Sequence, residues 1–228
     1  MNFKKKILFI LLLAVLAMCL ISPAGAQNTA GQRTIYAGEE IYAQVHRAVF
    51  YVRALDEDGT LYAAGTGFFI SSDGYALTAA HVIKNAASVD VELDNGSVFH
   101  SVKIFSSAAA EDIALLKLPA TPKECAYIPL AEAPPACGAA LYAIGYPLKT
   151  TKIMTDGMVS APEASINGSE TMLMTASLVN GMSGGPIVDA YGCAVGIASG
   201  TLRTMAGISI SPTLEQIRTM LTTVKTEG

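Results

Sequence analysis

Short apolar runs, each ended by turn-forming residues, fill almost the whole chain. The clearest runs span residues 48–55, 61–70, 89–93 and 113–118. After 89–93, the segment Asp94-Asn95-Gly96 has the composition of a tight hairpin turn. Many short strands separated by glycine and Asp-Gly turns are typical of all-β proteins. The pattern therefore predicts a β-sandwich or a pair of β-barrels.

A helical pattern is convincing only at the C-terminal end, over residues 213–228. Apolar side chains recur there at helical spacing, at Leu214, Ile217, Leu221 and Val224. Either Ser211 or Thr213 can cap the first turn, and Pro212 is compatible with that position. We expect one helix to follow the last strand.

The first 26 residues have the pattern of a signal peptide. Lys4-Lys5-Lys6 precede an apolar run at 7–21, and Ala24-Gly25-Ala26 resembles a signal-peptidase site. The apolar run is short for a membrane span. We expect cleavage after residue 26, export to the periplasm or the extracellular space, and no membrane contact afterwards. An uncleaved N-terminal anchor is the alternative. Residues 27–44 are expected to form an N-terminal segment before the folded part.

The remaining chain is acidic. Removing residues 1–26 takes away three of the 15 lysines and arginines and none of the 19 acidic residues, so the net charge becomes −7. An acidic chain without a basic run is a poor binder of nucleic acids. We therefore expect no nucleic-acid partner.

Cysteine and histidine spacing gives no framework for a metal or a cofactor. Three cysteines remain after loss of Cys19, so they cannot all pair within one chain. Cys125 and Cys137 either form a disulfide or are two separate buried thiols, and Cys193 lies in a strand-like run. The three histidines have no His-Glu-x-x-His spacing, so we predict no metal and no cofactor.

Three short segments carry reactive side chains. His81 follows two alanines, Asp112 precedes a strand-like apolar run, and Ser183 lies between Gly181-Met182 and Gly184-Gly185. A serine hydroxyl is a weak nucleophile that needs a neighbouring base, and the base needs a third group to hold its tautomer. Serine, histidine and aspartate are suited to these three roles, which points to nucleophilic catalysis.

In this order, the three segments resemble those of the trypsin-like (chymotrypsin-fold) serine proteases, and within them the bacterial HtrA/Deg-type proteases. The resemblance covers about residues 45–218 and only the protease part of those enzymes, so we expect no PDZ domain here. It implies two six-stranded antiparallel β-barrels and a C-terminal helix. We expect the first barrel at 45–125 and the second at 126–212, with the catalytic cleft between them.

The resemblance also implies roles for these residues. Ser183 is expected to be the nucleophile, His81 the general base, and Asp112 the group that orients it. The N–H groups of Gly181 and Ser183 are expected to form the oxyanion hole. Met182 departs from the family, whose members carry aspartate or asparagine there. Methionine can make neither the ion pair of an aspartate nor the side-chain hydrogen bonds of either residue. This departure is consistent with an oxyanion hole that forms only when substrate or a partner binds.

The resemblance implies a primary substrate pocket with walls of small residues. Its expected lining consists of Ser177, Ala198, Ser199, Gly200 and Gly207. Position 177 holds a serine and not an aspartate, so a preference of this pocket for a lysine or arginine of the substrate is not supported. Small apolar substrate residues are expected instead.

We expect a monomeric, exported serine endopeptidase that acts on a protein or peptide. Two alternatives stay open. One is a catalytically silent, protease-like binding protein, which only Met182 favours. The other is a partner-dependent protease dedicated to one protein substrate.

Overall fold

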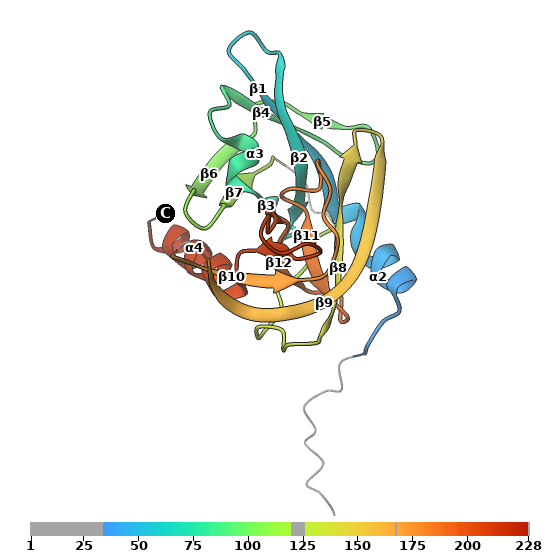
Figure 1. The fold of residues 1–228 in the computed structure, drawn as a ribbon. Coiled ribbons are helices and arrows are strands. Elements are labelled where there is room, and N and C mark those ends of the chain that lie inside the picture. Colours follow the sequence, from blue (N-terminus) through green and yellow to red (C-terminus); the bar gives the residue numbers. More distant parts are fainter. Residues whose placement is uncertain (1–33, 120–125, 167, 228) are drawn as a thin grey trace, which may run out of the picture. The chain divides into compact units, whose positions relative to one another are not determined.

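Two antiparallel β-sheets make up the folded unit, which spans residues 35–228 (Figure 1). The computed structural model describes residues 34–119, 126–166 and 168–227. The first sheet has the strand order β5-β4-β1-β2-β3-β7-β6. Its strands are β1 (Val49–Leu55), β2 (Leu61–Phe69), β3 (Tyr75–Thr78), β4 (Ser88–Glu92), β5 (Val98–Phe99), β6 (Lys103–Ala108) and β7 (Ile113–Lys117).

The second sheet follows in the chain and has the order β12-β11-β8-β9-β10-β14-β13. Its strands are β8 (Ala140–Leu148), β9 (Thr151–Ile166), β10 (Ser169–Met174), β11 (Pro186–Asp189), β12 (Ala194–Ile197), β13 (Gly200–Thr201) and β14 (Ser209–Ser211). Both sheets are antiparallel throughout, which confirms the predicted all-β, two-barrel architecture. Each described sheet contains seven strands and not six, because the two-residue strands β5 and β13 extend one edge of each.

Strand β9 has no counterpart among the predicted strands, although it is the longest, with 16 residues. Its sequence contains Asp156, Gly157 and Pro162 and lacks a continuous apolar run. The strand curves along the second sheet (Figure 1) and pairs with β8 on one side and β10 on the other. Since pairing with two neighbours satisfies its backbone, β9 does not need a strongly apolar sequence.

Four helices accompany the described sheets: α2 (Gly38–Val45), η1 (His46–Ala48), α3 (Ala80–Ile83) and α4 (Leu214–Glu227). Helix α4 confirms the predicted C-terminal helix. Thr213 is its cap, because the N–H of Gln216 donates to the Thr213 hydroxyl and the Gln216 side chain accepts from the Thr213 N–H. None of the helices in the described ranges is long and apolar enough to cross a membrane.

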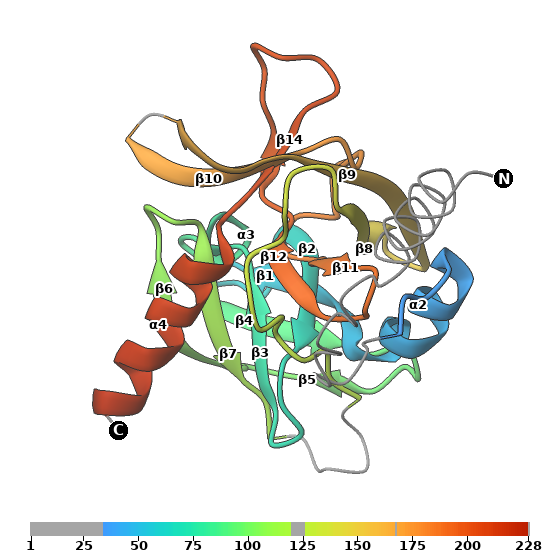
Figure 2. The same ribbon diagram turned by 90° about the horizontal axis from the view of Figure 1, so that it is seen from below.

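The hydrophobic core joins the two halves. Its larger cluster combines first-sheet residues such as Phe50 and Leu116 with Ile144 and Val188 of the second sheet and Ile217 of α4. Helix α4 thus returns from the second sheet to pack beside the first (Figure 2). The predicted signal peptide, residues 1–26, and the possible disulfide partner Cys125 lie outside the described residues.

Candidate active site

Asp112 and His81 meet where β3 ends beside the start of β7. Asp112 lies in the turn between β6 and β7 and has a φ of 60°, which is uncommon for a residue with a side chain. His81 lies in α3, directly after β3. The His81 Nδ1 is 2.8 Å from Asp112 Oδ2 and 3.0 Å from Oδ1, and the His81 backbone N–H donates to Oδ1 at 2.9 Å. One carboxylate therefore fixes both the backbone and the ring of the histidine.

This pair changes the acid–base behaviour of the imidazole. The hydrogen bond with Asp112 raises the pKa of His81 above its ordinary value; partial burial opposes the rise and the negative charge of Asp112 adds to it. Because Nδ1 faces the carboxylate, it is the nitrogen that carries the proton, and Nε2 is left as the acceptor in the neutral ring. The ring is 46% exposed, so it remains reachable from solvent.

Ser199, which lies between β12 and β13 of the second sheet, completes the environment of the carboxylate. Its hydroxyl donates to Asp112 Oδ2 at 2.8 Å. Ser199 was expected in the wall of the substrate pocket, but its hydroxyl is directed to the Asp112 carboxylate. The sequence offers no spacing that would reveal it, since 87 residues separate the two partners.

Ser183 lies on the turn between β10 and β11. Gly181 and Gly184 in this turn have φ values of 93° and 88°, which favour glycine. A Cβ built on Gly65 of β2 would lie 2.7 Å from the Val82 side chain and 2.8 Å from the Ser183 carbonyl oxygen. The turn that carries Ser183 therefore packs against β2 close to the residue that follows His81.

The backbone of this turn is held at several points. The N–H groups of Met182, Gly184 and Gly185 donate to the carbonyls of Val179, Ala198 and Met182, respectively. Within the described part of the chain, the N–H groups of Gly181 and Ser183 donate to no protein acceptor. These two amide donors beside a serine are available to bind an oxyanion.

Met182 is fully buried and belongs to the core cluster of the second sheet. Its side chain packs among apolar residues, so this position contributes an apolar contact and no side-chain ion pair or hydrogen bond.

The remaining residues predicted for the substrate pocket are spread around the turn. The Ser177 carbonyl accepts from the Thr155 hydroxyl at 2.7 Å, and Ala198 is buried beneath the turn. Gly200 belongs to the short strand β13, and Gly207 lies in the exposed turn that follows. A Cβ on either glycine would meet no atom within 4 Å.

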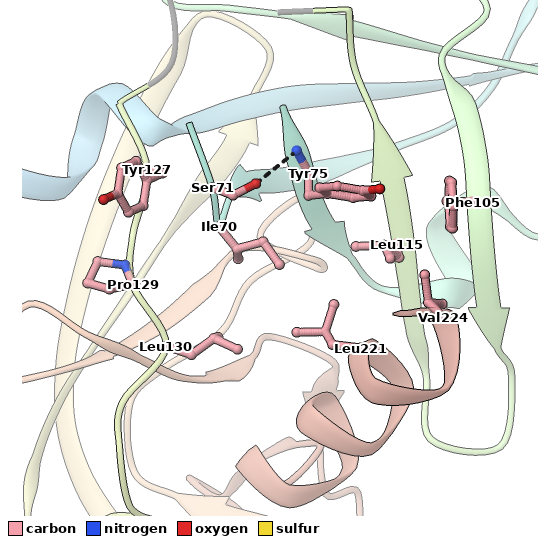
Figure 3. A pocket seen from close by; sticks show the side chains of 10 residues that line it. All are labelled: Ile70, Ser71, Tyr75, Phe105, Leu115, Tyr127, Pro129, Leu130, Leu221 and Val224. Carbon is pink, nitrogen blue, oxygen red and sulfur yellow. Dashed lines mark hydrogen bonds between the residues drawn. The ribbon is translucent and has the colours of Figure 1, made fainter. Parts of the chain in front are cut away.

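Two cavities border the Asp112 side chain. One, of about 410 Å³, is lined by His81, Ile83 and Lys84, and one of about 300 Å³ includes Ser199 and Glu170. A cavity of about 630 Å³ lies elsewhere, between α4 and the first sheet, with a largely apolar lining that includes none of the predicted site residues (Figure 3). In the described ranges, histidine, cysteine and acidic residues form no cluster suited to a metal ion.

One further polar residue touches the turn and was missed in the sequence. Thr66 of β2 is completely buried, and its hydroxyl donates to the Gly181 carbonyl at 2.7 Å. Its N–H also donates to the Ser183 carbonyl at 2.8 Å. Thr66 lies between Gly65 and Gly67 in a segment that resembles the family, but nothing in that segment indicates a contact with Gly181.

Comparisons with known proteins identify the family of the chain. Residues 65–197, more than half of the chain, match the trypsin-like peptidase domain. Serine protease HTRA1B of Danio rerio is 33% identical over 186 residues, which is 78% of this chain and 38% of that protein. Serine protease HTRA4 of Mus musculus is 30% identical over 185 residues, 78% of this chain and 38% of its own length. This chain thus spans well under half the length of both relatives.

The fold is also similar to a solved structure. The serine endoprotease from Yersinia pestis superimposes with a TM-score of 0.72 at 24% identity, covering 84% of this chain and 67% of that one. The resemblance drawn from the His81, Asp112 and Ser183 segments is confirmed at the level of the family. The chain belongs to the trypsin-like peptidase family, and its relatives include the HtrA serine proteases.

Proposed function

We propose that this protein is an exported serine endopeptidase with Ser183 as nucleophile, His81 as general base and Asp112 as the orienting carboxylate. The observation that carries the proposal is the 2.8 Å contact between His81 Nδ1 and Asp112 Oδ2. It fixes the tautomer in which Nε2 accepts a proton.

In the proposed reaction, the Ser183 Oγ attacks the carbonyl carbon of the scissile peptide bond while its proton passes to His81 Nε2. The carbonyl π electrons move to the oxygen, which is stabilised by the N–H groups of Gly181 and Ser183. Collapse of this intermediate breaks the C–N bond, and the leaving amine takes the proton from Nε2. Water, deprotonated by His81, then hydrolyses the acyl-enzyme and regenerates the Ser183 hydroxyl.

The electrostatics support these steps. The imidazolium that forms during attack is stabilised by the Asp112 carboxylate, in the same direction as the raised pKa of His81. Ser199 donates to that carboxylate and keeps it in place. The Ser199 hydroxyl, the Asp112 carboxylate and the His81 ring thus form a connected hydrogen-bonded set, to which the proposed attack adds the Ser183 hydroxyl.

Labelling with a fluorophosphonate probe tests the proposal, because the probe reacts with an activated serine. We expect the wild-type protein to be labelled, Ser183→Ala to be unlabelled, and His81→Ala to react far more slowly. His100→Ala is the matched control: His100 Nδ1 also contacts an aspartate, Asp90, at 2.9 Å. That variant should be labelled like the wild type.

The outcomes separate the alternatives. Labelling that persists in Ser183→Ala assigns the nucleophile to another residue. A folded wild-type chain that is neither labelled nor cleaves any member of a random peptide library is a protease-like binding protein. Labelling together with cleavage of one cognate protein alone identifies a dedicated protease.

Export and substrate preference belong to the same proposal. Residues 1–26 have the sequence of a signal peptide, so N-terminal sequencing of the secreted protein should begin at Gln27. We propose small apolar residues before the scissile bond, because Ser177 supplies no negative charge for a basic side chain. Mass spectrometry of library fragments from wild type and Ser183→Ala measures that preference directly.

A further inference from the structure

Thr66 is a buried polar residue that reaches from the first sheet into the turn of the second. Its side chain is completely buried, although it lies on β2 among apolar neighbours. Its hydroxyl donates to the Gly181 carbonyl at 2.7 Å and accepts from the Tyr146 N–H at 2.9 Å. Because an N–H can only donate, the hydroxyl hydrogen is directed to Gly181.

The same residue holds the turn at a second point. The Thr66 N–H donates to the Ser183 carbonyl at 2.8 Å. Thr66 therefore fixes the peptide unit that begins at Gly181 and the unit that begins at Ser183. The unit between them carries the Ser183 N–H, and its own carbonyl, from Met182, accepts from the Gly185 N–H at 2.9 Å.

The direction of an amide N–H is set by the peptide plane to which it belongs. With three successive planes tied down, the Ser183 N–H has a fixed direction, and the Gly181 N–H is attached to a fixed neighbour. We propose that Thr66 is a positioning residue that orders the oxyanion hole before substrate binds. This inference rests on the proposed function, since it assigns a task within the same site.

The position of Met182 explains why such a residue is needed. Its side chain is buried in the apolar core and donates no hydrogen bond to the turn. A side-chain hydrogen bond to this part of the turn must therefore come from another segment, and the Thr66 hydroxyl supplies it from the other barrel. A preorganised hole spares the reaction the cost of ordering two donors when charge develops.

Substitution at Thr66 tests the role. Thr66→Val keeps the shape and removes the hydroxyl, whereas Thr66→Ser keeps the hydroxyl. Loss of a whole oxyanion donor costs roughly 10²–10³ in turnover, so misalignment of the donors should lower kcat about 10–100-fold in Thr66→Val. KM should change less than about threefold, because the hole acts on the transition state and not on bound substrate. Thr66→Ser should retain most of the activity.

Ser211→Ala is the matched control. Ser211 is equally buried, and its hydroxyl also accepts from a backbone N–H, that of Ile197, and donates to a carbonyl, that of Pro212. It should lose stability to a similar degree while its kcat stays close to wild type. A peptide boronate, which binds as a tetrahedral adduct, provides a second readout: its affinity should fall in Thr66→Val by the same factor as kcat.

Each result decides the matter. Thr66→Val that folds and keeps kcat within about threefold overturns the inference, as does an equal loss in Ser211→Ala. If Thr66→Val does not fold, Thr66→Ala is measured in its place. If neither variant folds but Thr66→Ser does, the hydroxyl contributes to stability alone and the inference is overturned. A wild-type protein that a fluorophosphonate does not label refutes the proposed function itself, whereas a labelled wild type with an unaffected Thr66→Val refutes only the role of Thr66.

Discussion

Removal of the Ser199 hydroxyl should slow catalysis without altering substrate choice. The hydroxyl donates to Asp112 Oδ2 at 2.8 Å, and this carboxylate holds the ring of His81. A hydrogen bond to a charged group contributes about 1.5–3 kcal/mol. The Asp112 side chain is 25% exposed, so water can replace part of the interaction. We therefore take the lower end of the range, about 1.5 kcal/mol.

This energy translates into a rate. Since each 1.4 kcal/mol corresponds to about a factor of ten, Ser199→Ala should lower kcat about tenfold. The loss acts through Asp112 and the His81 ring, so it should be the same for every peptide substrate. Steady-state kinetics on a set of peptides that differ at the residue before the scissile bond measures both kcat and KM. Ser199→Thr, which keeps the hydroxyl, should restore most of the rate.

The alternative role of Ser199, as a wall of the substrate pocket, predicts a different result. A wall residue would change KM, and the change would depend on the substrate side chain. If Ser199→Ala keeps kcat within about twofold of wild type for all peptides, the hydroxyl does not position Asp112. A loss that varies strongly from peptide to peptide would likewise assign Ser199 to substrate binding.

Two further predictions concern the turn and the imidazole. Gly184→Ala should lower the free energy of unfolding by more than about 2 kcal/mol, because the φ of 88° is unfavourable for alanine and a Cβ would overlap the Thr66 carbonyl oxygen. Gly207→Ala, with a φ of 77° in open space, should lose only about 1 kcal/mol in the same denaturant titration. In Asp112→Asn, the pKa of His81 should fall, as measured by NMR titration. In the wild type, the raised pKa of His81 stabilises the folded state fully at pH values below 6.5, the ordinary pKa of histidine, and this contribution disappears as the pH rises through the raised pKa. The variant should therefore lose stability mainly at acidic pH.

The sequence was most informative where a reactive side chain stands next to residues that a particular backbone conformation requires. Ser183 stands between glycines whose left-handed backbone only glycine adopts readily, and His81 follows small residues at a strand end. Such residues are rare in combination, so the segments were recognised and the family was predicted correctly. The contact between His81 and Asp112 was expected from that resemblance and is present in the structure.

Strand β9 was missed for a physical reason. The strands that were predicted are apolar because they are buried, but much of β9 is partly exposed, and neighbours on both sides satisfy its backbone. Hydrophobic pattern reports burial and does not report pairing. A long, polar, twice-paired strand therefore has no signature in a single sequence, and residues 151–166 could not be predicted as one strand.

The supporting hydroxyls had no signature either, and their arrangement has a consequence for the site. Thr66 reaches from the first sheet to Gly181 in the second, and Ser199 reaches from the second sheet to Asp112 in the first. These two hydrogen bonds cross the junction in opposite directions, over sequence separations of 115 and 87 residues. Each half of the site is thus aligned by a residue of the other half. Geometry of this kind is a property of how the two sheets pack, because neither sheet contains both a reactive group and the hydroxyl that holds it.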